Sequence, residues 1–285
     1  MSRISPEAPV PVVEFDHESF MPGGGECGAE PECVGVQTEL VGSVGEDAAA
    51  KTLRRLLEAE GGLSGLLRHG QRPTSIKTRI IANRQQLVRV DREARGDLKG
   101  PASERLWRRV QSRLPGVDGV IVGDYGKGVV TQGLLDRVRE ACRHRGIWLS
   151  LDPKPVHRLD LSGLSLLTPN RKEVFELAGV ADLAPAVEPL RDAMLQEVAA
   201  RLLEELRPAL LLVTLGEHGM LLCQRGQAAV HIPTRAREVF DVSGAGDTVI
   251  GVFTLAIVAG RRRWRRRSCR TTRRGWWWGS WARRW

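Results

Sequence analysis

The stretch from Phe240 to Thr248 reads Phe-Asp-Val-Ser-Gly-Ala-Gly-Asp-Thr and opens an apolar helical pattern that starts near Ala245. The small residues Gly244, Ala245 and Gly246 allow backbone N–H groups to approach an anion, and a helix N-terminus adds partial positive charge there. Asp247 falls in the first helical turn, where a carboxylate can accept a proton during phosphoryl transfer. The competing interpretation is a tight turn in which Asp247 only complements the helix dipole.

Upstream of this stretch, short apolar runs alternate with amphipathic ones, as in successive βαβ units. The runs predict a mostly parallel sheet with strands at 117–122, 147–151, 165–167 and 210–214 and a further strand at 219–223. The amphipathic stretches predict helices at 133–143, 171–178 and 188–206, and the last helix continues from 245 past 257. We therefore expect a single α/β unit.

Three polar segments follow the predicted strands, where open α/β sheets bind ligands. Asn170–Arg171–Lys172–Glu173 supplies oxygen ligands suited to a divalent cation such as Mg²⁺, although the same spacing also forms a helix capping box. Lys154 could reach a phosphate or remain solvated. Thr214 and Gly216 could lie beside a nucleotide, or could belong to a plain hairpin turn that continues to Gly219.

Residues 74–91 alternate around a polar centre and predict a hairpin. It carries four basic residues, Lys77, Arg79, Arg84 and Arg89. Such a cluster suits a substrate that already carries a phosphate, whereas the alternative is ordinary surface charge.

The formal net charge of +9 arises from the C-terminal end alone. Residues 261–285 hold eleven Arg, no acidic residue and six of the eight Trp, which leaves −2 for residues 1–260. Five scattered cysteines show no metal-ligand spacing, so we expect no zinc site or disulfide framework and a reducing compartment. We see no signal peptide or membrane span and expect a soluble protein.

The Asp241–Thr248 string and the Asn170–Glu173 element resemble signatures of the ribokinase-like (pfkB) carbohydrate kinases. Segments 2–12, 83–91 and 123–128 are similar to those of the heptose 7-phosphate kinases, and the resemblance covers about residues 2–22 and 36–260. It implies a three-layer α/β sandwich with a small β lid. It also implies ATP, Mg²⁺ and K⁺ as ligands, a cytoplasmic location and a homodimer formed through the lid.

The resemblance also implies roles for individual residues. Asp247 would be the catalytic base, with Gly244, Ala245 and Gly246 as the anion hole, and Asp241 and Ser243 would help to hold K⁺. ATP and Mg²⁺ would contact Asn170, Arg171, Lys172, Glu173, Thr214 and Gly216. The sugar phosphate would contact Lys77, Arg79, Arg84, Arg89, Asp124 and Lys154. The implied reaction is phosphorylation of heptose 7-phosphate at its anomeric hydroxyl, in the synthesis of lipopolysaccharide-core precursors, and no separate protein metal centre is implied.

Three segments depart from the family pattern. Family members begin with a strand that ends in a substrate-binding Asp, and this chain begins after it. Residues 25–33 lack the family's substrate-binding Asn and its apolar helix, but GC-rich reverse translation read one base later gives Ala-Asn-Val-Ala-Arg-Asn-Leu-Asn-Ala. A shift of two bases over residues 263–284 gives an apolar string that begins Val-Glu-Ala-Ala-Val-Val-Pro-Asn-His and resembles the kinases' closing segment. We interpret residues 25–35 and the tail as read out of frame.

The expected organisation is a kinase domain over residues 1–260 followed by an aberrant Arg- and Trp-rich tail over 261–285. The alternatives are another sugar kinase of the same family, or a non-catalytic remnant. Arg-rich segments interleaved with Trp also bind nucleic acid, and a polycation would do so adventitiously. Altered segments 25–35 and 261–285 leave the activity of this particular chain open.

Overall fold

The computed structural model describes residues 2–4, 11–13, 37–59, 63–82, 85–183, 186, 188–234 and 244–268. Its largest sheet has six strands in the order β12-β11-β10-β9-β8-β7. Four of them are parallel: β7 (Gly119–Gly123), β8 (Trp148–Asp152), β9 (Leu166–Leu167) and β10 (Leu210–Thr214). The antiparallel strands β11 (Met220–Cys223) and β12 (Val230–Ile232) complete the sheet. This mostly parallel sheet confirms the sequence prediction.

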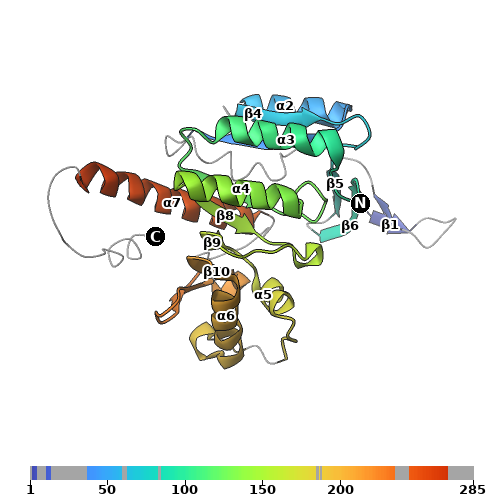
Figure 1. Cartoon of the computed structure of the whole chain (residues 1–285). Coiled ribbons are helices and arrows are strands. Elements are labelled where there is room, and N and C mark those ends of the chain that lie inside the picture. The colour runs from blue at the N-terminus through green and yellow to red at the C-terminus, as the bar shows by residue number, and fades with distance from the viewer. Residues whose placement is uncertain are drawn as a thin grey trace.

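Helices cover both faces of the sheet and make three layers (Figure 1). Because side chains alternate along a strand, Leu211 and Val213 of β10 pack with α4 (Gln132–Arg145), α5 (Arg171–Ala178) and α6 (Ala193–Leu206). Leu210 and Leu212 face the other way and pack with Ile250 of α7 (Ala245–Ser268). The predicted three-layer sandwich is confirmed.

Side-chain caps define where the connecting helices begin. Thr131 accepts a hydrogen bond from the Leu134 N–H at α4, and Asp192 accepts one from the Leu195 N–H at α6. The predicted helix over 188–206 is wrong at its start, because a short 3₁₀ turn, Pro189–Arg191, precedes the Asp192 cap. Its C-terminal boundary is correct.

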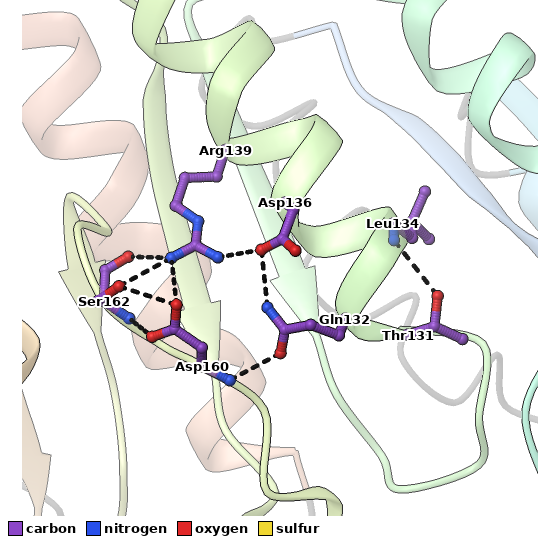
Figure 2. Close-up of polar contacts among 7 residues, drawn as sticks. All are labelled: Thr131, Gln132, Leu134, Asp136, Arg139, Asp160 and Ser162. Carbon is purple, nitrogen blue, oxygen red and sulfur yellow. Dashed lines mark hydrogen bonds and ion pairs between the residues drawn. The ribbon is translucent and has the colours of Figure 1, made fainter.

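The connection from β8 to β9 is tied to α4 by a group of polar contacts (Figure 2). The Arg139 Nη1 atom donates to the Ser162 carbonyl at 2.7 Å and contacts the Asp160 carboxylate at 3.2 Å, while Nη2 pairs with Asp136. The Gln132 side chain bridges Asp136 and the Asp160 N–H. These contacts therefore hold the loop between β8 and β9 against α4.

The N-terminal half forms smaller units beside the main sheet. The parallel pair β3 (Glu39–Val44) and β4 (Leu63–Arg68) packs with α2 (Ala48–Ala59) and contacts α3 (Gly100–Arg113). Another two-stranded sheet consists of β1 (Ser2–Ile4) and β2 (Pro11–Val13). None of the described helices combines the length and apolar character that a membrane span requires.

The predicted hairpin is present as β5 (Ile76–Ala82) and β6 (Gln85–Arg92), which pair in antiparallel register. It forms its own two-stranded sheet outside the main one. Figure 1 places it on the right of the view, whereas the C-terminal half of α7 extends to the left. The hairpin predicted over residues 74–91 is therefore confirmed as a unit separate from the main sheet, and its role as a lid stays a prediction.

Candidate active site

The carboxyl ends of β7, β8, β9 and β10 bring the predicted polar segments onto one edge of the sheet. The Asp124 N–H donates to the Asp152 carbonyl at 3.1 Å, which joins the segments after β7 and β8. The Thr168 hydroxyl donates to Asp152 Oδ1 at 3.1 Å, and the Thr214 N–H donates to the Pro169 carbonyl at 3.0 Å. Segments far apart in the chain therefore form a continuous rim where open α/β sheets bind ligands.

The N-terminus of α7 completes this rim. Gly244 has φ +81°, a left-handed conformation that suits glycine, and its carbonyl accepts the Thr248 N–H at 2.9 Å. Ala245 and Gly246 are exposed at the start of the helix, and Asp247 is half-buried in its first turn. The carboxylate Oδ1 of Asp247 accepts a hydrogen bond from the Tyr125 hydroxyl at 2.9 Å. The two residues predicted to hold K⁺, Asp241 and Ser243, lie outside the described residues.

Asp152 lies at the centre of the rim and its charge is disfavoured. Burial raises the pKa of Asp152 to about 7, and the nearby carboxylates of Glu173 and Asp247 add to the effect. The Thr168 hydrogen bond and the Lys154 ammonium group act in the opposite direction. The rim therefore favours the protonated form of Asp152, and a bound cation would offset the charge of its ionised form.

The Asn170–Glu173 element forms the full capping box that its spacing predicted. The Glu173 N–H donates to Asn170 Oδ1 and the Asn170 N–H donates to Glu173 Oε2, each at 3.0 Å. Glu173 is buried, and its Oε1 accepts from the Lys154 ammonium at 3.1 Å. The local contacts thus explain this element as a cap, and they also direct both residues to the rim beside Lys154 and Asp152.

Its two central residues point to other carboxylates. The Arg171 guanidinium contacts Asp182 at 2.7 Å and Asp192 at 2.8 Å, and these hydrogen bonds raise the pKa of Arg171. Lys172 is exposed and pairs with Glu176 one turn along α5, at 3.5 Å. Arg171 therefore fastens the segment before α6 to α5, and the ATP contact expected of both residues stays a prediction.

Asp124 is almost fully buried, with 3% of its surface exposed. Its Oδ1 accepts the Gly126 N–H at 2.9 Å and its Oδ2 contacts His157 Nδ1 at 3.1 Å. Burial raises the pKa of Asp124, while these hydrogen bonds and His157 lower it. Asp124 therefore shapes the loop after β7, and the direct sugar contact predicted for it stays untested.

The segment after β10 is the predicted hairpin turn between β10 and β11. Thr214 continues the sheet through a parallel bridge with Asn170, which sets the two predicted nucleotide-side residues next to each other. Gly216 has φ +59° and open space where a side chain would lie. The nucleotide contact expected of Thr214 and Gly216 stays a prediction.

Three of the four predicted hairpin residues are described. Lys77 and Arg79 on β5 and Arg89 on β6 are exposed, whereas Arg84 lies outside the described residues. Arg79 is the direct cross-strand partner of Arg89, and Lys77 is the partner of Asp91, so all four share one face of the hairpin. Arg89 contacts Asp91 at 2.9 Å. This basic face places two guanidinium groups opposite each other, an arrangement that an anion would stabilise.

Sequence reasoning assigned no role at the rim to four residues: Tyr125, Asp152, Thr168 and His157. Asp152 and Thr168 each end or follow a predicted strand, and that position is a signal that could have identified them. Tyr125 is the only tyrosine in the chain and lies inside the 123–128 segment. His157 contacts Asp124 through a 3₁₀ turn, for which the sequence gives no warning.

The rim suits Mg²⁺ by its donor chemistry. Carboxylates and an amide are the hard oxygen ligands that Mg²⁺ prefers, and the carboxylates of Glu173 and Asp247 lie close enough to Asp152 to add to the rise in its pKa that burial causes. Within the described part of the chain, no cluster of three or more His, Cys, Asp or Glu side chains could enclose a metal ion. The residues present therefore fit an ion that keeps water and phosphate oxygens among its ligands.

Comparison with known proteins identifies relatives of this arrangement. The family described as "pfkB family carbohydrate kinase" matches residues 11–266, so most of the Arg- and Trp-rich tail lies outside the match. The bifunctional protein HldE of Citrifermentans bemidjiense is 42% identical over 260 residues, which cover 90% of this chain and 52% of that protein. HldE of Pseudomonas savastanoi pv. phaseolicola is also 42% identical, over 91% of this chain and 52% of its own length. The chain thus spans about half the length of these relatives.

Solved structures share the fold at low sequence identity. Phosphofructokinase-2 from Escherichia coli superposes with a TM-score of 0.69 at 18% identity, over 90% of this chain and 81% of that one. Ribokinase from Giardia lamblia superposes with a TM-score of 0.67 at 18% identity, over 85% of this chain and 74% of that one. These similarities confirm the predicted ribokinase-like architecture.

Proposed function

Since this chain belongs to the pfkB family of carbohydrate kinases, we propose that it phosphorylates heptose 7-phosphate at the anomeric hydroxyl, with ATP as the phosphoryl donor. The observation that carries the catalytic part is the position of Asp247 in the first turn of α7, on the same rim as Asn170, Glu173 and Asp152. A carboxylate and a helix N-terminus that face one ligand-binding edge are what in-line phosphoryl transfer requires.

In the proposed reaction, the Asp247 carboxylate accepts the proton of the sugar hydroxyl as that oxygen forms its bond to the γ-phosphorus of ATP. The bond between the γ-phosphorus and the bridging oxygen breaks, and ADP leaves with its electron pair. The N–H groups of Gly244, Ala245 and Gly246 at the start of α7 stabilise the negative charge that develops on the phosphoryl oxygens. Mg²⁺, held near Asn170 and Glu173, would neutralise charge on the phosphates.

The basic hairpin face supports a substrate that already carries a phosphate group. Lys77, Arg79 and Arg89 are exposed on one face of β5 and β6, where Asp91 lies opposite Lys77 and pairs with Arg89. Arg79 and Arg89 repel each other unless an anion lies between them. We assign the 7-phosphate of the sugar to this face, together with Arg84, and keep Lys154 as a second phosphate ligand.

The relatives named HldE support heptose as the sugar, while another sugar of the same enzyme family is the second candidate. A calorimetric titration of the chain with heptose 7-phosphate, heptose and fructose 6-phosphate separates them. We expect heptose 7-phosphate to bind most tightly, and Arg79→Ala to weaken its binding by about ten- to a hundredfold, the range for a hydrogen bond between charged groups. Lys51→Ala, an exposed lysine on α2, is the matched control. Tighter binding of fructose 6-phosphate would overturn the substrate assignment.

Further ligands and partners belong to the same proposal. We assign K⁺ to Asp241 and Ser243, and a phosphofructokinase-2 structure from Escherichia coli is described in complex with potassium. We also propose a homodimer formed through the hairpin, because Ile81, Val88 and Val90 expose 62%, 47% and 55% of their surface. A cytoplasmic location follows from the same family assignment. Nucleic acid would bind only adventitiously, through the tail.

A further inference from the structure

The loop from Gly123 to Gly128 carries a contact that none of the proposed ligand roles uses. The Tyr125 hydroxyl donates a hydrogen bond to Asp247 Oδ1 at 2.9 Å, across 122 residues of sequence. We propose that Tyr125 is a positioning residue that orients the Asp247 carboxylate toward the sugar hydroxyl; this inference rests on the base function proposed for Asp247. A hydrogen bond to one carboxylate oxygen restricts rotation of the group and so directs its other oxygen.

The tyrosine ring is seated on the end of β7. A Cβ atom at Gly123 would lie 3.2 Å from Tyr125 Cε2 and 3.4 Å from its hydroxyl oxygen, closer than most side chains pack. Glycine at this position therefore leaves the space in which the ring crosses from β7 toward α7. Packing on the backbone limits the orientations of the ring, although 45% of the residue surface remains exposed.

Buried contacts hold the loop on the sheet side of Tyr125. The Asp124 carboxylate accepts the Gly126 N–H at 2.9 Å and contacts His157 at 3.1 Å, and the Asp124 N–H donates to the Asp152 carbonyl at 3.1 Å. Asp124 itself is only 3% exposed. The residue that precedes Tyr125 is therefore fixed from three directions.

The other side of the loop is joined to both ends of the β5–β6 hairpin. Arg72, which precedes β5, donates to the Lys127 carbonyl at 2.5 Å, and Lys127 pairs with Glu93, which follows β6, at 2.5 Å. A Cβ atom at Gly128 would lie 2.2 Å from the Gly96 carbonyl oxygen. Tyr125 therefore stands in a braced loop between the hairpin proposed to bind the sugar phosphate and the carboxylate proposed to accept the proton.

The test uses the fact that the chain has a single tyrosine. Labelling the full chain with ¹³Cζ-tyrosine gives one NMR resonance, and its shift with pH reports when the Tyr125 hydroxyl ionises. A phenol that donates to a carboxylate should ionise above the ordinary value of about 10, since the negative charge and the hydrogen bond both favour the protonated phenol. Asp247→Asn should lower the midpoint toward about 10.

Glu140→Gln removes an exposed carboxylate on α4 and should leave the midpoint unchanged. A midpoint near that of a free phenol in the unaltered chain, or one that Asp247→Asn does not move, would overturn the positioning contact. The titration needs no turnover, so it tests the Tyr125–Asp247 contact separately from the sugar-kinase proposal.

Where turnover with heptose 7-phosphate is measurable, Tyr125→Phe should lower kcat by about ten- to a hundredfold, the range for loss of a hydrogen bond to a charged group. The KM for Mg·ATP should stay unchanged, because the phenol acts on the base and not on the nucleotide. An equal loss in both parameters would indicate a general structural defect and would contradict the positioning role.

Discussion

Three carboxylates from different elements lie on one rim: Asp152, Glu173 and Asp247. This concentration of charge is the residue-level basis of the site. Burial is the main cause of the raised pKa of Asp152, and repulsion from Glu173 and Asp247 adds to it. Lys154 supplies a cation to this group and pairs with Glu173 at 3.1 Å. Binding of Mg²⁺ with ATP would offset the negative charge of these carboxylates. The charge that is unfavourable to bury would therefore also give the rim its affinity for a cation.

Asp247→Asn should leave Mg·ATP binding largely intact while it removes phosphoryl transfer. A general base acts on the sugar hydroxyl and not on ATP, so its loss lowers turnover by roughly 10²- to 10⁴-fold. Calorimetric titration with Mg·ATP, or with a non-hydrolysable analogue, checks the first part, and ADP release checks the second. Loss of nucleotide binding in Asp247→Asn would contradict the base assignment.

Asp152→Asn should make stability less sensitive to pH between 5 and 8. The folded pKa of Asp152, about 7, lies above its ordinary value of 3.8. Protonation of Asp152 therefore contributes its full share to the free energy of unfolding below pH 3.8. This contribution is lost as the pH rises through about 7. Since a tenfold change in a protonation equilibrium is about 1.4 kcal/mol, and Asp152 is partly exposed, the unaltered chain should lose roughly 1–3 kcal/mol over this range relative to the variant.

Denaturant unfolding at pH 5 and pH 8 measures this difference. Asp97→Asn, an exposed carboxylate, should show the pH dependence of the unaltered chain. Adding Mg²⁺ at pH 8 should stabilise the unaltered chain more than Asp152→Asn, because the ion and the ionised carboxylate attract each other. Identical pH profiles for Asp152→Asn and the unaltered chain would contradict the buried-charge interpretation.

Sequence reasoning identified those rim residues that stand in recognisable local patterns. Asn170 and Glu173 were found from a three-residue spacing, and Asp247 from a run of small residues. Tyr125 was missed because its importance depends on a partner 122 positions away. Arg171 was expected at ATP because it lies inside the signature, and only the fold shows its pairing with Asp182 and Asp192.

Elements were predicted well where a local cap or strand pattern specified them. The boundaries of α5 match the prediction because Asn170 caps one end and Gly179, with φ +66°, ends the other. The start of α6 was missed because Pro189 is compatible with a first helical turn, and the sequence does not distinguish a 3₁₀ turn from it. Pairing of β3 with β4 also went unpredicted, since neither strand carries a strong apolar alternation.

Ile250→Ala should test how α7 is held against the sheet. Ile250 is 1% exposed and packs with Leu166, Leu210 and Leu212 from two neighbouring strands. Removing its buried methyl groups should lower the free energy of unfolding by about 2–5 kcal/mol. Val252→Ala on the same helix, where 53% of the residue is exposed, should change stability by less than about 1 kcal/mol. Comparable losses from both substitutions, in denaturant unfolding, would show that α7 does not pack as described.

At the scale of the whole molecule, the sheet edge is formed almost entirely from the C-terminal half, whereas the hairpin comes from the N-terminal half. The loop over 123–128 connects them through Arg72 and Glu93 on one side and Tyr125 on the other. The residues proposed to bind the nucleotide therefore come from the C-terminal half, while most of those proposed to bind the sugar phosphate lie in N-terminal segments. Residues 25–33 fall in that acceptor-side part of the family pattern and lie outside the described residues.

We expect this chain to show little or no kinase activity, and replacement of residues 25–33 and 263–284 by their shifted-frame strings to raise it. Holding the acceptor beside ATP is the main contribution of such an enzyme, and residues 25–33 lack the family's Asn. Eleven arginines in residues 261–285 also repel one another and cannot enter a core unpaired, so an apolar closing segment should add buried area worth about 25 cal/mol per Å². Against a net stability of about 5–15 kcal/mol, that gain is large.

Each replacement should be made alone and together. The closing segment alone should raise the unfolding temperature and sharpen the transition, whereas the 25–33 segment should tighten heptose 7-phosphate binding with little change in Mg·ATP affinity. Only the double replacement should combine cooperative unfolding with ADP release that depends on heptose 7-phosphate. Comparable turnover by the unaltered chain would contradict this prediction, because kinase activity would then require neither replacement. Turnover restored by the closing segment alone would instead assign the defect to folding, since acceptor contacts at 25–33 would then be dispensable.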